Sequence, residues 1–147
     1  MTNNVSLPSM RIMAFDYGTK RVGVAVTDPL QLIATALDTI HAQDVHAFVQ
    51  AYVAKEPVER FVVGMPRQMD GTDSENAQHV RGFMRKLQRM FPDIPVETVD
   101  ERFTSKLAVA SIAQSGLSRK RRQDKGLVDT VSAVLILQSY LEKRSIQ

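Results

Sequence analysis

The chain has 147 residues, a length that one domain with a single core usually fills, and its 44% hydrophobic and 24% charged residues are typical of a globular protein. It contains no cysteine, which excludes disulfides and thiolate metal sites, and its three histidines lack the spacing of zinc ligands. No apolar run is long enough to cross a membrane, and the formal net charge of +3 is only weak support for a polyanionic partner.

The first nine residues are polar and carry no charged side chain. They lack the basic and apolar regions of a secretion signal. We expect a flexible tail over residues 1–9, one domain over residues 10–147 and a cytoplasmic location.

The first half of the chain begins with strand-like segments. Residues 11–17 and 21–28 are apolar and are separated by a turn that contains Gly18, which predicts a β-hairpin. Residues 33–40 can add a third strand. Asp44 then stands at the N-cap position of a segment whose apolar residues recur at helical spacing.

The middle of the chain alternates strand and helix. Residues 60–64 are apolar enough for a strand covered on both faces, and Thr72 with Glu75 forms a capping-box pattern for a second helix. Residues 96–99 predict a fifth strand. The second helix has an inward apolar face (Val80, Met84, Leu87 and Phe91) and an outward arginine stripe (Arg81, Arg85 and Arg89).

The last third contains a short helix, a basic segment and a long helix. Thr104 or Ser105 can cap a helix that ends near Gly116, residues 119–125 are strongly basic, and residues 127–142 form a mostly apolar helix. Three strands followed by alternating helices and strands predict an α/β fold with a central mixed five-stranded sheet flanked by helices.

Four carboxylates stand where this fold can bring them together. Asp16 ends the first strand, Asp100 and Glu101 end the last, and Asp129 lies near the start of the final helix. Ligands of α/β sheets bind at the carboxyl ends of parallel strands. If the first and last strands are parallel neighbours, Asp16 meets Asp100 or Glu101 there. A final helix packed across the sheet then adds Asp129.

Such a group predicts a divalent-cation site. Three neighbouring carboxylates repel one another unless a cation joins them, and their oxygens suit Mg²⁺ or Mn²⁺. Two ions about 4 Å apart can bind the attacking and leaving oxygens of a phosphodiester displacement. Lys20 and Arg21, just beyond Asp16, would then contact substrate phosphates.

Each acid also has a purely structural interpretation. Asp16 can be a turn residue, and Asp129 can be an acid favoured by the helix dipole. Asp100 or Glu101 can pair with Arg102 at the surface. Strand alternation does not decide between Asp100 and Glu101, because the end of the strand is uncertain by a residue or two.

Four segments together resemble the YqgF family, also called RuvX and known as Holliday junction resolvase-like proteins. They are FDYGTKRVGVAVTD, VVGMPRQMDGT, VDERFTS and DTVSAVLILQSYL, and the resemblance covers nearly the whole chain, from about residue 10 to residue 141. It implies an RNase H-like fold and a metal-dependent nuclease that matures the 5′ end of pre-16S rRNA.

The resemblance also assigns roles to residues. The family's acids fall on Asp16, Glu101 and Asp129, which are therefore the expected catalytic residues and ligands of Mg²⁺ or Mn²⁺, with Asp100 in reserve. The expected substrate-binding residues are cations and one hydroxyl near these acids: Lys20, Arg21, Arg102, Thr104, Arg119, Lys120, Arg121 and Arg122. Arg102 and Thr104 can equally be pairing and capping residues.

Other functions stay open at this point. The implied substrate is structured RNA, the ribosomal precursor, acted on by itself or within ribosomal particles. A Holliday junction resolvase would cut four-way DNA, usually as a symmetric dimer, and nothing in the sequence specifies more than a monomer or weak homodimer. A third hypothesis is a weakly catalytic RNA- or ribosome-binding factor.

Overall fold

A computed structural model describes residues 10–66, 74–100 and 125–146, and the side chains of the last segment for residues 130–144. In this part of the chain five strands form one sheet: β1 (Arg11–Tyr17), β2 (Arg21–Thr27), β3 (Ala34–His41), β4 (Val58–Met65) and β5 (Val96–Asp100). Their order is β3-β2-β1-β4-β5. β1, β4 and β5 run parallel, whereas β2 is antiparallel to both of its neighbours, so the predicted mixed sheet is confirmed.

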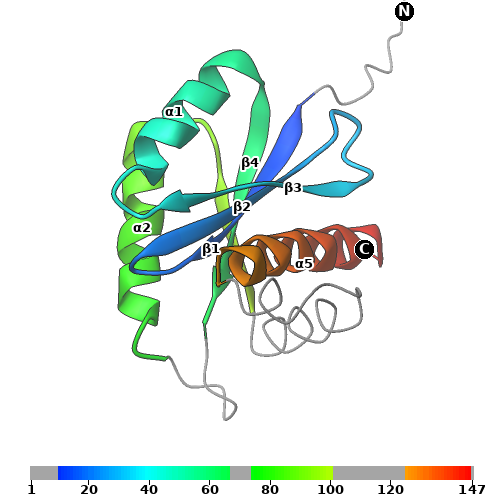
Figure 1. Cartoon of the computed structure of the whole chain (residues 1–147). Coiled ribbons are helices and arrows are strands. Elements are labelled where there is room, and N and C mark those ends of the chain that lie inside the picture. Colours follow the sequence, from blue (N-terminus) through cyan, green and yellow to red (C-terminus); the bar gives the residue numbers. More distant parts are fainter. Residues whose placement is uncertain (1–9, 67–73, 101–124, 147) are drawn as a thin grey trace, which may run out of the picture.

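Helices cover both faces of the sheet. α1 (Val45–Lys55) and α2 (Ala77–Met90) pack on one face, and α5 (Lys125–Ile146) lies across the other (Figure 1). The alternation of β1 fills both interfaces, because Met13 and Phe15 join the core under α1 and α2 while Ile12 and Ala14 join the core under α5. None of the described helices combines the length and apolar character of a membrane span.

Most of the predicted elements are confirmed within a few residues. The hairpin is present, the third strand begins at residue 34, and the final helix runs from residue 125 rather than 127. The helix after Asp44 is present, but the Asp44 side chain makes no capping hydrogen bond. The short helix expected between residues 104 and 116 lies outside the described residues.

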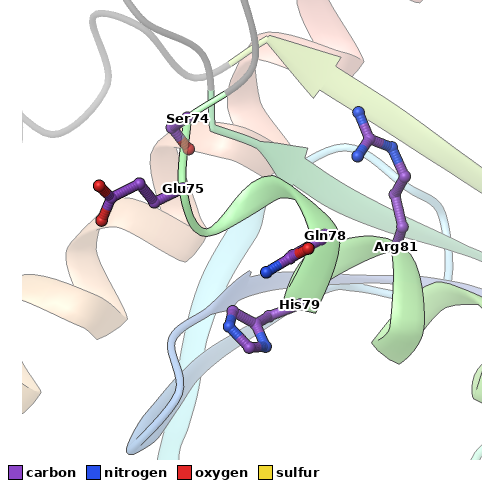
Figure 2. A pocket seen from close by; sticks show the side chains of 5 residues that line it. All are labelled: Ser74, Glu75, Gln78, His79 and Arg81. Atoms are coloured by element: carbon purple, nitrogen blue, oxygen red, sulfur yellow. The ribbon is translucent and has the colours of Figure 1, made fainter.

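The start of the second helix differs from the prediction. α2 begins at Ala77, so Glu75 precedes the helix (Figure 2), and Thr72 lies outside the described residues. Asn76 at the N-cap position makes no side-chain cap. Its Nδ2 instead donates to the carbonyl oxygen of Tyr17 at 3.0 Å. The amide therefore ties the start of α2 to the end of β1 instead of capping its own helix.

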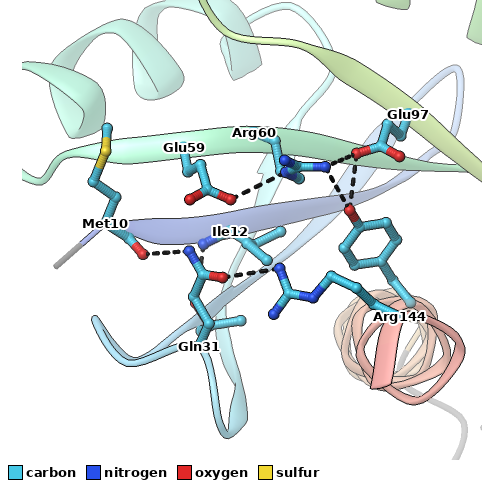
Figure 3. A network of polar contacts seen from close by, with 9 residues as sticks. Met10, Ile12, Gln31, Glu59, Arg60, Glu97 and Arg144 are labelled. Atoms are coloured by element: carbon cyan, nitrogen blue, oxygen red, sulfur yellow. Dashed lines mark hydrogen bonds and ion pairs between the residues drawn. The ribbon is translucent and has the colours of Figure 1, made fainter. Parts of the chain in front are cut away.

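Polar contacts hold the other end of the sheet against α5 (Figure 3). Arg60 of β4 donates to Glu97 of β5 and, at 2.8 Å, to the Tyr140 hydroxyl, which itself donates to Glu97 at 2.8 Å. Arg144 donates to Gln31 Oε1 at 2.9 Å. These contacts fix the C-terminal half of α5 over the amino ends of β4 and β5, so the helix starts toward their carboxyl ends.

Candidate active site

Asp16 lies on the face of the sheet that α5 covers. It is the next-to-last residue of β1, and successive residues of a strand point to opposite faces. Ile12 and Ala14 pack in the core that α5 closes, and Phe15 packs in the other. Asp16 is two residues beyond Ala14 and four beyond Ile12, so it lies on the same face of the sheet as both, and it is half-buried. A rigid strand therefore delivers this carboxylate to the α5 side at the carboxyl edge.

Glycines flank Asp16 on both neighbouring strands. Gly23 of β2 is its direct partner. Phe15 pairs with Val63 of β4, so the next residue, Gly64, lies level with Asp16. Both glycines are buried. Because neither position carries a side chain, no side chain of an adjacent strand lies directly beside the carboxylate on this face.

The first turns of α5 lie over the same row of the sheet. Thr39 of β3 lies in the cross-sheet row of Asp16, and its Oγ1 forms a hydrogen bond with Oγ1 of Thr130. Residue 129 directly precedes Thr130 in the backbone of α5. The backbone of α5 therefore carries Asp129 at the level of Asp16.

The position of β5 differs from the sequence-based expectation that the first and last strands are neighbours. The parallel strands β1 and β5 are not neighbours, because β4 lies between them and separates their axes by about 10 Å. Asp100 alternates with Val99, which packs on the α5 side, so Asp100 lies on the face opposite to Asp16. The structure thus does not bring Asp100 and Asp16 together, and Glu101 lies outside the described residues.

Two of the predicted phosphate-binding cations stand at the same edge as Asp16. Lys20, which is exposed, and Arg21, which is half-buried, follow the turn of the β1–β2 hairpin. The Gly18 amide donates to the Arg21 carbonyl oxygen at 2.9 Å. A Cβ at residue 18 would lie 2.8 Å from that oxygen, so this tight turn requires glycine. The other predicted contacts lie outside the described residues: Arg102, Thr104, Arg119, Lys120, Arg121 and Arg122.

The described side chains contain only part of the predicted cation site. Among them, no three His, Cys, Asp or Glu side chains come together as a metal site. Of the three predicted ligands, only the side chain of Asp16 belongs to the described part of the chain. Its hard carboxylate oxygens, beside two glycines, fit Mg²⁺ or Mn²⁺ in chemistry and in space.

The sequence pattern does not show that the two glycines flank Asp16. It places Gly64 at the end of the strand over residues 60–64, beside a loop that either fits the substrate or only connects strand and helix, and it gives Gly23 no role. A signal was present, because an isolated glycine inside an apolar strand marks a close approach of a ligand or another backbone. Only the register shows that both flank the same carboxylate.

The fold and the acid at the tip of its central strand define the class of the protein. RuvC from Thermus thermophilus in complex with a Holliday junction substrate superimposes with a TM-score of 0.53, covering 92% of this chain and 96% of that chain at 18% identity. The fold is therefore RNase H-like.

The chain belongs to the RuvX family. The sequence profile of this family, described as Holliday junction resolvase, matches residues 10–143. A Bacteroides thetaiotaomicron protein is 52% identical over 91% of this chain and 97% of its own length, and it has the name "Putative pre-16S rRNA nuclease". A Porphyromonas gingivalis protein with the same name is 52% identical over 90% of this chain and 96% of its own length.

Proposed function

We propose that this protein is a divalent-cation-dependent nuclease that processes the 5′ end of pre-16S rRNA. The observation that carries the proposal is the position of Asp16, at the carboxyl edge of the sheet, between two glycines and level with the first turns of α5. The names of relatives about half identical to this chain support the ribosomal precursor as the substrate.

In this proposal three acidic residues together bind the divalent cation. Asp16, Glu101 and Asp129 would hold Mg²⁺ or Mn²⁺, and the bound ion would supply activation of water and stabilisation of the leaving 3′ oxygen of the phosphodiester. The rigid strand β1 fixes Asp16, and packing of α5 on the sheet fixes the backbone of residue 129. The side-chain-free positions at Gly23 and Gly64 give the scissile phosphate its approach to Asp16.

Cations around the acids bind the substrate in this scheme. Lys20 and Arg21 neutralise phosphates beside Asp16, Arg102 and the basic segment 119–122 neutralise further phosphates, and the Thr104 hydroxyl donates a hydrogen bond to one. The proposed location is the cytoplasm, where the precursor or the ribosomal particle that carries it meets the enzyme as a monomer or weak homodimer.

A cleavage assay tests the proposal. The substrates are an RNA with the 5′ precursor region of 16S rRNA, free and within ribosomal particles, and a four-way DNA junction of equal concentration. We expect cleavage of the RNA that requires Mg²⁺ or Mn²⁺ and that falls at least about a thousandfold in the Asp16→Asn variant. Faster cleavage of the junction would instead make the protein a resolvase.

The matched control is Asp44→Asn. Asp44 is an exposed carboxylate whose side chain makes no cap at the start of α1. Asp44→Asn therefore removes one negative charge, as Asp16→Asn does, without breaking a capping hydrogen bond. Full activity in this control excludes a general charge effect. Metal-independent cleavage, or unchanged cleavage by Asp16→Asn, would refute the proposal.

A further inference from the structure

The helix α2 has an unusual charge. Its 14 residues include four cations (Arg81, Arg85, Lys86 and Arg89) and no acid. This charge exceeds the formal net charge of the whole chain, which is +3. Helices on protein surfaces commonly pair their cations with acids three or four residues away. α2 itself therefore supplies no acid to pair with these four cations.

The arginines of α2 form one exposed row. Val80 and Leu87 are buried against the sheet, and Arg81, Arg85 and Arg89 are exposed on the outer side of the helix. Their spacing of four residues places successive Cα atoms about 6 Å apart along the axis, so the row is about 12 Å long. We call these three residues and Gly82, which lies among them, the α2 stripe.

Gly82 leaves a gap in the stripe. A Cβ at this position would meet only Arg85 Nη2, at 3.9 Å, so no packing contact requires glycine there. Glycine inside a helix costs roughly 1 kcal/mol relative to alanine. Between two arginines on an outer helix surface, its lack of a side chain allows a ligand backbone to lie against the helix.

The stripe begins at the edge of the sheet that carries Asp16. Asn76 fixes the start of α2 to the last residue of β1, one position after Asp16. Arg81 lines an open hollow of about 540 Å³ at this first turn, together with Ser74, Glu75, Gln78 and His79 (Figure 2). From there α2 leads away from the edge toward Arg89.

We propose that the α2 stripe binds the phosphate backbone of a duplex segment next to the cleavage site. This inference rests on the proposed function and adds to it the path of the substrate. Regularly spaced cations match the regular charge of a duplex, and phosphate contacts position a nucleic acid without reading its bases. The exposed side of α2 carries no Phe, Tyr or Trp to stack unpaired bases, as single-strand binders have.

A salt titration tests the stripe. Binding of a short labelled RNA duplex with a single-stranded extension is measured in EDTA between about 50 and 200 mM KCl. We expect the double variant Arg85→Gln/Arg89→Gln to lower the salt slope by about 1.8, because each phosphate contact contributes about 0.9. Near 0.1 M salt the affinity should fall roughly eightfold per arginine. A DNA duplex of equal length shows whether the stripe distinguishes the two backbones.

Two further variants make the test specific. Lys55→Gln/Lys143→Gln removes two exposed cations outside the stripe, and it should leave the slope unchanged. Gly82→Glu closes the gap and adds an anion, and it should weaken binding more than either single arginine variant. Glu forms helices better than Gly, and a Cβ has room at this position. The temperature of thermal unfolding of the Gly82→Glu variant should therefore not fall below that of the wild type.

The outcomes separate this inference from the proposed function. Wild-type binding and cleavage with an unchanged slope in the double arginine variant would overturn the stripe and leave the nuclease standing. A slope that falls as expected in a protein that cleaves no RNA would overturn the nuclease and retain the stripe. Competition by polyglutamate as strong as that by RNA would assign α2 to an acidic protein partner instead.

Discussion

On the face of the sheet that α5 covers, the charged side chains at the two ends have different neighbours. At the amino ends of β4 and β5, large polar side chains pair with one another: Arg60 binds Glu97, and Tyr140 joins both. At the carboxyl end, Asp16 has glycines as neighbours on both adjacent strands. The amino end is therefore lined by large polar side chains that pair with one another, whereas at the carboxyl end the positions beside Asp16 on both adjacent strands carry no side chain.

This difference separates stability from activity along one face. A charge that is matched internally holds helix and sheet together, whereas a carboxylate beside positions without side chains can accept an external cation. We therefore expect substitutions at the carboxyl end to change cleavage with little effect on folding. Substitutions at the amino end should do the reverse.

Among the substitutions that compare the two ends, Gly64→Ala is expected to have the largest effect. A methyl group beside Asp16 would shift the bound cation or phosphate, and a displacement of about 1 Å can cost roughly a hundredfold in rate. We expect kcat/KM for RNA cleavage to fall between about tenfold and a hundredfold, with the unfolding midpoint nearly unchanged. Ala36→Val, on the exposed strand β3, is the control and should retain activity. Equal activity of both variants would show that Asp16 needs no free space on its β4 side.

Arg60→Met tests the opposite end. Its side chain is 29% exposed, so loss of its bonds to Glu97 and Tyr140 should cost about 2 kcal/mol, less than a fully buried pair would. Urea unfolding measures this loss, and cleavage per folded molecule should stay constant. A double-mutant cycle with Tyr140→Phe isolates their coupling. A large loss of kcat in Arg60→Met would contradict the division between the two ends.

The sequence predicted the elements better than their arrangement. Apolar segments located all five described strands, although β3 contains no fully buried residue. The position of β4 between β1 and β5 has no local signal, since strand order depends on contacts between distant segments. The capping box failed for a similar reason, because Asn76 bonds to β1 rather than to its own helix.

The candidate site was predictable only in part. Asp16 was identifiable from an apolar strand that ends in an acid, and the structure places it at the predicted edge. Asp100 lies on the opposite face of the sheet from Asp16. This follows from the pairing of Val99 with Gly64 and from the packing of Val99 under α5, which only the structure shows. Glu101 and Asp129 remain predictions as ligands, because their side chains lie outside the described part.

A smaller effect is expected at Asp28, in the β2–β3 loop near the amino end. Its carboxylate accepts backbone hydrogen bonds from Ile33 at 2.7 Å, Leu32 at 2.8 Å and Leu30 at 3.2 Å. These bonds, first that of Ile33, lower the pKa of Asp28 below its ordinary 3.8 despite some desolvation. Because water competes at this exposed loop, we expect Asp28→Ala to cost about 1 kcal/mol at pH 7.

The dependence of this cost on pH follows from the sign of the shift. A carboxyl group with a lowered pKa in the folded state stabilises the protein above its ordinary pKa. That contribution is lost as the pH falls through the folded pKa, below 3.8. Urea unfolding of wild type and Asp28→Ala from pH 7 downward should show a constant difference until about pH 5, and a shrinking one below pH 4. A difference that grows in acid would contradict this account.

The smallest expected effect lies at the carboxyl end, at Thr39→Val. This substitution keeps the shape of the side chain but removes the hydroxyl that contacts Thr130 near the start of α5. We expect a loss of about 0.5 kcal/mol in unfolding free energy and of about threefold in cleavage, because this contact helps hold the first turns of α5 over Asp16. Thr35 lies on the same strand and is exposed, so Thr35→Val should change neither the unfolding free energy nor the cleavage rate. If Thr39→Val loses stability without any loss of cleavage, the start of α5 contributes to the fold alone, and the carboxyl end would resemble the amino end more than the glycines suggest.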